Sequence, residues 1–120
     1  MAERPAKDLS LLLDMLLAAR DAQDFVAGMD AAAFRASRLH QNAVIRSLEV
    51  IGEAAGKVSP GFRAAHPTIP WHEIVGMRHR LIHDDAEVDL DLVWSVVGEE
   101  LDPLIATLAP LIPPEDAPDT

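Results

Sequence analysis

The chain has 120 residues and a formal net charge of −10, and it contains no cysteine. These values exclude a disulfide framework, a thiolate zinc site and sequence-blind binding to nucleic acid, which depends on a basic surface. No apolar run approaches the roughly 20 residues of a membrane span, and Met1–Lys7 is too short and too charged for a signal peptide, so we expect a cytoplasmic, soluble protein with one domain over 1–112.

The first two predicted helices contain most of the apolar residues. Apolar side chains at helical spacing predict a helix over 8–26, and a second over 30–58 with Asp30 as its N-cap. The second helix is apolar around most of its circumference, which is typical of a central helix in a bundle. One polar stripe interrupts this surface, at Asn42, Arg46, Glu49 and Glu53. The stripe is either a solvated strip with pairing along the helix, or the place where a charge from another helix is received.

Two prolines mark the next predicted helices. Ser59 followed by proline predicts a short third helix that ends near His66, with the serine as N-cap and the proline at the first helical position. A second proline starts the fourth helix, over 71–83, in the same way. An acidic turn follows at 84–89.

The last predicted helix begins after Asp89, which can act as its N-cap. Pro103 should kink this helix, because proline removes one backbone hydrogen bond. The acidic, proline-rich segment 113–120 predicts a disordered tail. No stretch shows sustained alternation typical of a strand. The sequence therefore predicts an all-α, up-and-down helical bundle of four to five helices.

The fourth predicted helix carries an arginine in an unexpected place. At 100° per residue, Arg78 points in the same direction as Trp71 and Ile82 on the apolar face. A guanidinium cannot lose its charge, so its burial is tolerated only if carboxylates or a functional cleft receive it. We expect Arg78 to be mostly buried and to meet a carboxylate of the second helix, Glu53 in preference to Glu49.

Three histidines share a neighbouring flank of this helix: His72, His79 and His83. Such a stripe is often only the wet side of an amphipathic helix. The spacing of His79 and His83 can hold a metal, but that face offers no cysteine and no well-placed carboxylate. We therefore expect no metal and no cofactor.

Histidine and arginine together can support cleavage of RNA. Histidine takes or gives a proton near neutral pH, and arginine holds a phosphate and stabilises the charge that develops on it. These groups suffice for attack of an RNA 2′-hydroxyl on its own phosphodiester. Arg78 and His83 are five residues apart, roughly 140° around an ideal helix. They converge on one phosphate only if the helix ends near His83 or if a second subunit contributes its own copy.

Two sequence motifs resemble those of a known family. Arg78 and His83, separated by four residues, are preceded by Ile69-Pro70-Trp71 and Gly76-Met77, and the segment 51–57 reads Ile-Gly-Glu-Ala-Ala-Gly-Lys. Over about 9–112 the chain resembles the HEPN superfamily, and specifically its HepT-like ribonuclease toxins.

The resemblance implies an endoribonuclease toxin of a toxin–antitoxin pair that acts on RNA as a homodimer. Arg78 and His83 of each subunit would line a cleft at the two-fold axis, with Arg78 binding the phosphate and His83 acting as general acid or base. His79, with Arg80 beside it, would bind substrate. The partner would be a small nucleotidyltransferase antitoxin, with no membrane and no DNA involved.

The sequence departs from the family pattern at one position. The resembled toxins are neutralised by transfer of AMP to a tyrosine two residues after the motif histidine, and here that position is Asp85, in a chain without any tyrosine. AMP transfer to tyrosine is therefore impossible. The alternatives to a toxin are a non-catalytic helical subunit that binds a nucleotidyltransferase or a nucleotide, and a dimeric scaffold.

Overall fold

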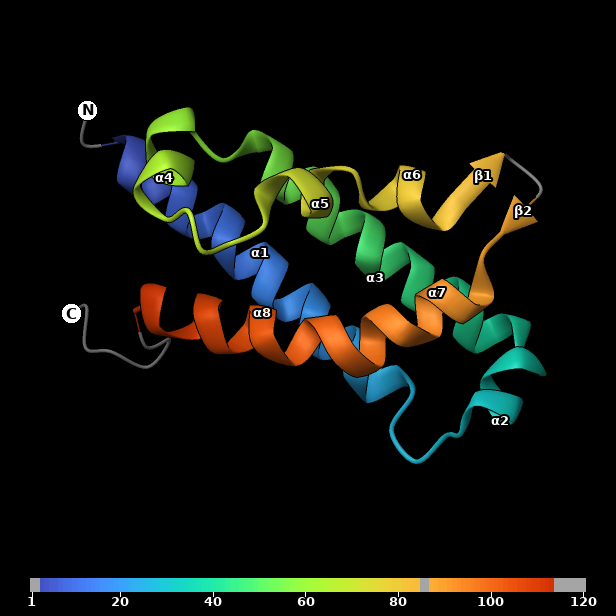
Figure 1. The fold of residues 1–120 in the computed structure, drawn as a ribbon. Helices are drawn as coiled ribbons and strands as arrows, with labels where there is room; N and C mark the ends of the chain where they lie inside the picture. Colours follow the sequence, from blue (N-terminus) through green and yellow to red (C-terminus); the bar gives the residue numbers. More distant parts are fainter. Residues whose placement is uncertain (1–2, 85–86, 114–120) are drawn as a thin grey trace.

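The computed structural model describes residues 3–84 and 87–113 and confirms the all-α class. Three long helical rods run alongside one another: α1, α3 and the continuous run from α7 to α8. α4 lies at the start of α1, and α5 and α6 lie along α3 (Figure 1). The elements are α1 Glu3–Phe25, α2 Ala31–Arg35, α3 Arg38–Lys57, α4 Pro60–Ala65, α5 Trp71–Val75, α6 Met77–Leu81, β1 Ile82–Asp84, β2 Glu87–Val88, α7 Leu90–Ser95, the π-helix η1 Val96–Glu100, α8 Leu101–Leu108 and the 3₁₀-helix η2 Ala109–Leu111.

The core lies between the three rods. α1 and α3 pack on each other more extensively than any other pair of elements. The largest side chains that are fully buried come from all three rods, from α2 and from the α4–α6 segment: Phe34, Leu12, Met15, Leu48, Ile51, Ile69, Leu81, Leu101 and Leu108. Removing these apolar surfaces from water is the main force that holds the bundle together.

The second predicted helix is divided in two. Asp30 caps α2 as expected, accepting a hydrogen bond from the backbone N–H of Ala33. The helix then stops at Ala36, and Ser37 caps α3 anew by accepting from the N–H of His40. Because serine offers the backbone this local hydrogen bond, it favours a helix start over a helix interior. The predicted single helix over 30–58 is therefore wrong at this point.

The start of α4 is tied to α1 by a buried carboxylate. Ser59 caps α4 as predicted, and its N–H and hydroxyl both donate to Asp8, at 2.9 and 2.7 Å. Asp8 is only 5% exposed. Its two oxygens each receive a hydrogen bond, which offsets the cost of removing the carboxylate from water.

The fourth predicted helix is also divided. α5 ends at Gly76, and α6 restarts at Met77 and lasts only to Leu81. The break allows Met77 and Leu81, at 3% and 1% exposure, to face the core. The predicted unbroken helix over 71–83 is therefore wrong, and so is the projection that placed Arg78 at the centre of its buried face.

A short antiparallel ladder includes residues on both sides of the predicted acidic turn, of which 85 and 86 lie outside the described residues. β1 and β2 pair Ile82 with Val88 and Asp84 with Glu87. The N–H of Asp89 donates to the carbonyl of Leu81 at 2.8 Å, and the Asp89 carboxylate caps α7 as predicted. The hairpin thus carries the chain from α6 to the third rod.

The third rod contains a local widening just before Pro103. The rod stays helical from α7 to α8, but the five residues of η1 adopt the π-helical hydrogen-bond pattern. A proline ring clashes with the carbonyl four residues earlier, here Glu99, and a π-turn relieves that crowding. The rod thus departs from α-helical geometry just before Pro103, and the kink at Pro103 stays a prediction. Of the predicted tail 113–120, all but Pro113 lies outside the described residues.

Gly52 sets the distance between α3 and α5. A Cβ added there would lie 3.0 Å from the carbonyl oxygen of Ile74, whereas a Cβ on Gly56, one turn later, would meet only Val75 at 3.9 Å. We expect Gly52→Ala to lower the free energy of unfolding by about 1–3 kcal/mol because the backbones must move apart.

Gly56→Ala is the matched control on the same helix. It should be neutral, or stabilising by up to about 1 kcal/mol through helix propensity. Urea unfolding followed by circular dichroism measures both variants, and equal effects of the two substitutions would contradict the close approach at Gly52.

Candidate active site

A polar cleft of about 480 Å³ lies between α3 and the α5–α6 segment. It is lined by Arg46, Glu49, Gly52, Glu53, Val75, Arg78 and His79. The polar stripe of the second predicted helix thus forms one wall, and the start of α6 forms the other. Gly52 lies in the same wall, so the close approach of α3 and α5 also determines the width of the cleft.

Arg78 meets α3 at Glu49. The Arg78 Nη1 atom donates to Glu49 Oε2 at 2.9 Å, and the side chains are 60% and 21% exposed, respectively. The expected burial of Arg78 is therefore wrong, and so is Glu53 as its partner. The break at Gly76 turns Met77 toward the core in place of Arg78, and the guanidinium emerges in the cleft opposite Glu49.

Arg46 is a second cation of the cleft, which the sequence indicates only as a member of the polar stripe. Its Nη1 lies 3.9 Å from Glu49 Oε1 and 3.9 Å from Glu53 Oε1. Glu49 therefore lies between two arginines, whereas Glu53 is 64% exposed and pairs with Arg46. The interpretations left open for the stripe both apply in part: one carboxylate receives Arg78, and the rest is a solvated strip. In the sequence, the feature that indicates these contacts is the spacing of Arg46, one helical turn before Glu49 and two before Glu53.

The three histidines are not equivalent. His79 is exposed and lines the cleft beside Arg78, whereas His72 is exposed on α5 and does not line it. The backbone of His83 lies in β1, after α6 has ended, and its side chain is outside the described residues. Asp85 is outside them as well. One condition for convergence of Arg78 and His83 is met, because the helix ends two residues before His83.

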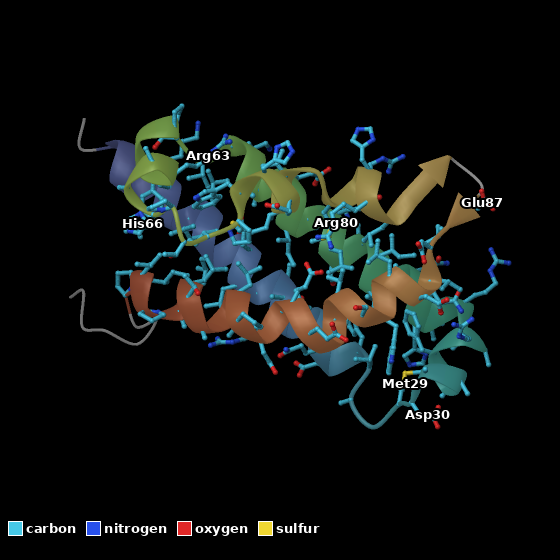
Figure 2. All side chains as sticks on the ribbon, in the orientation of Figure 1. Met29, Asp30, Arg63, His66, Arg80 and Glu87 are labelled. Atoms are coloured by element: carbon cyan, nitrogen blue, oxygen red, sulfur yellow. The ribbon has the colours of Figure 1, made fainter. Side chains whose placement is uncertain are left out.

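Arg80 lies on the side of α6 opposite to Arg78 and pairs with a different element. Its Nη1 and Nη2 donate to Glu100 Oε1 and Oε2 at 3.0 and 2.8 Å, a bidentate pair with η1. Figure 2 shows Arg80 between α6 and the rod that contains η1 and α8. The hydrogen bonds to Glu100 raise the pKa of Arg80, and this effect exceeds the opposing effect of partial burial. Arg78 and His79, but not Arg80, are among the residues that line the cleft.

The cleft combines two arginines that can hold an anion with a histidine, His79, beside them. Two arginines and two glutamates give the cleft a formal charge of about zero, whereas the whole chain has a net charge of −10. An anionic ligand therefore encounters two cations in the cleft and less repulsion there than from the chain as a whole. Among the described residues there is no group of three side chains able to hold a metal ion. No helix in the described part of the chain is long and apolar enough to span a membrane.

Known proteins similar to this chain are ribonucleases by name. A family model described as "Ribonuclease HepT-like" matches residues 15–111. A "Putative RNase" of Methanocaldococcus jannaschii is 38% identical over 101 residues, which cover 84% of this chain and 91% of the relative. A "Probable ribonuclease HepT" of Thermococcus cleftensis is 43% identical over 68 residues, 57% of this chain and 62% of the relative. No solved structure gives a significant match.

Proposed function

The chain belongs to the HepT-like ribonuclease family, and we propose that it is a metal-independent endoribonuclease that acts as the toxin of a toxin–antitoxin pair. The observation that carries this proposal is the cleft in which Arg78 and His79 face the α3 stripe, at the end of a helix that leads directly to His83. Its restraint in the cell would come from a small nucleotidyltransferase.

Arg78 would hold the scissile phosphate of the RNA. The 2′-hydroxyl gives its proton to water as its oxygen attacks phosphorus, the bond from phosphorus to the 5′-oxygen breaks, and a 2′,3′-cyclic phosphate and a 5′-hydroxyl result. Charge that accumulates on the phosphate oxygens is stabilised by the guanidinium. His83 would give a proton to the leaving 5′-oxygen. The hydrogen bond that Arg78 donates to Glu49 orients the Arg78 side chain in the cleft, and His79 lies beside it to bind substrate.

The end of α6 supports the joint action of Arg78 and His83. After Leu81 the backbone becomes extended, with φ −121° and ψ 108° at Ile82. The roughly 140° separation of an ideal helix therefore does not apply at His83.

We expect ribonuclease activity to survive EDTA and to be lost in both Arg78→Ala and His83→Ala. The reason is that phosphate binding and proton transfer by these side chains need no metal. His72→Ala is the matched control, a histidine on α5 that does not line the cleft, and it should retain most activity. The measurement is cleavage of total RNA by purified protein, with and without EDTA. Cleavage at the wild-type rate by His83→Ala would contradict the proposal.

The alternative is a non-catalytic subunit that binds a nucleotidyltransferase partner or a nucleotide. One observation favours it: Arg78 already has a carboxylate partner in Glu49, and the cleft holds a second carboxylate in Glu53. Protein that cuts no RNA under any condition, yet binds the nucleotidyltransferase, would support this alternative.

The α1–α3 face supports a homodimer. Among the described residues the exposed large apolar side chains are Leu17, Phe25, Leu39 and Val75. Leu17 and Phe25 line a groove between α1 and α3 that also contains Asp21 and Arg46, and Arg46 lines the cleft too. Contiguous exposed apolar surface is typical of an interface. A face that carries both charge signs can pair with its own copy across a two-fold axis.

We expect the protein to have twice the chain mass of 13.0 kDa in light scattering at micromolar concentration. Leu17→Glu with Phe25→Glu should give a monomer, because the new carboxylates would have to be buried in the interface. Ala64→Glu with Ala106→Glu adds the same charge at exposed positions of α4 and α8, and it should remain a dimer. A monomeric wild type would contradict a cleft that is shared between two subunits at a two-fold axis.

Control by the antitoxin should not involve AMP on this chain, because the chain has no tyrosine and its motif position is Asp85. The acidic surroundings of that position favour weak intrinsic activity and docking of the antitoxin. The test is incubation with the neighbouring nucleotidyltransferase and ATP, followed by intact mass measurement. We expect an unchanged mass, and a gain of one AMP unit would show that another residue has replaced the tyrosine.

A further inference from the structure

The orientation of α6 cannot come from the helix itself. α6 has five residues and no side-chain cap, and Gly76 and β1 lie at its ends. A helix this short has no stability of its own, so its rotation about its axis depends on contacts with other elements. Met77 and Leu81 anchor one side in the core. Arg78 and Arg80, two residues apart and so roughly 200° around the helix, extend toward different neighbours.

The contact made by Arg80 is the better defined of the two. The Nη1 and Nη2 atoms of Arg80 each donate to a different carboxylate oxygen of Glu100, and the Arg80 side chain is 27% exposed, compared with 60% for Arg78. A bidentate arginine–carboxylate pair restricts direction as well as distance. Glu73, at the other side of Gly76, adds attraction for the same guanidinium.

Glu100 is presented to α6 by the π-turn. η1 includes one residue more per hydrogen-bonded turn than an α-helix. Val96 and Val97 at its start and Leu101 directly after its end are all buried. The backbone around Glu100 is thus anchored in the core. α6 is held between α3, through Arg78 and Glu49, and η1, through Arg80 and Glu100.

We propose that Arg80 is a positioning residue, whose ion pair with Glu100 fixes the rotation of α6 and so holds Arg78 and His79 at the cleft. This inference rests on the proposed ribonuclease function. The sequence suggests that Arg80 contacts RNA. In this proposal Arg80 instead acts on the reaction indirectly, by positioning Arg78 and His79.

The experiment compares Arg80→Gln, Glu100→Gln and the double variant in two measurements. The first is kcat and KM on a short fluorogenic RNA that the wild type cuts. Each single variant should lower kcat roughly tenfold with KM nearly unchanged, since small displacements of reacting groups reduce rates by this order or more. The double variant should be no slower than either single one, because both remove the same interaction.

The second measurement is amide hydrogen exchange over 77–82, which needs no RNA. Exchange should become several-fold faster in the three variants, because α6 loses one of its attachments. Arg35→Gln is the matched control: it removes an arginine from an exposed ion pair with Asp91 on α7, and it should change neither kcat nor exchange in α6.

The outcomes separate this inference from the proposed function. A wild type that cuts no RNA rejects the ribonuclease, while faster exchange in the three variants would still support the attachment of α6. The positioning role is overturned if exchange stays at the wild-type rate, if exchange rises with kcat unchanged, or if the losses in kcat multiply in the double variant. It is also overturned if Arg80→Gln raises KM while Glu100→Gln leaves activity unchanged, which would indicate direct contact with RNA.

Discussion

The close approach of two backbones at Gly52 is the constraint on which the site depends. A Cβ atom at this position would meet the carbonyl oxygen of Ile74 at 3.0 Å, so glycine lets α5 lie directly on α3 without a shift of either backbone. That contact places the start of α6 opposite the α3 stripe, within reach of Glu49. Packing between the helices therefore brings Arg78 to within 2.9 Å of Glu49. The ion pair itself cannot hold the two helices together, because exposed ion pairs contribute little stability by themselves.

The fold class could be predicted from sequence because it depends on apolar periodicity and local capping. Asp30, Ser59 and Asp89 cap their helices as their sequence context indicates. The location of Arg78 could not be predicted in the same way. A helical projection assumes an unbroken helix, and the break at Gly76 goes together with a contact to α3 more than twenty positions earlier in the chain. The ion pair between Arg80 and Glu100 could not be predicted for a similar reason, since Glu100 lies in a π-turn that shifts the helical register.

The electrostatics of the cleft reconcile an acidic chain with an anionic substrate. Each arginine of the cleft has a carboxylate within 4 Å, so these cations are held in place before any ligand arrives. Long-range attraction for RNA is weak on a chain of net charge −10, because the summed field of the protein is negative. Recognition must then depend on short-range contacts, and association should be slower and less sensitive to salt than for a basic nuclease.

The π-turn also has a consequence for assigning residues of the third rod to helix faces. A π-turn closes its hydrogen bonds one residue later than an α-helix does, so a spacing that keeps residues on one face within α7 or within α8 does not hold from one to the other. The faces before 96 and after 100 must therefore be assigned separately. A substitution in α8 that is chosen by counting helical turns from α7 would fall on a neighbouring face.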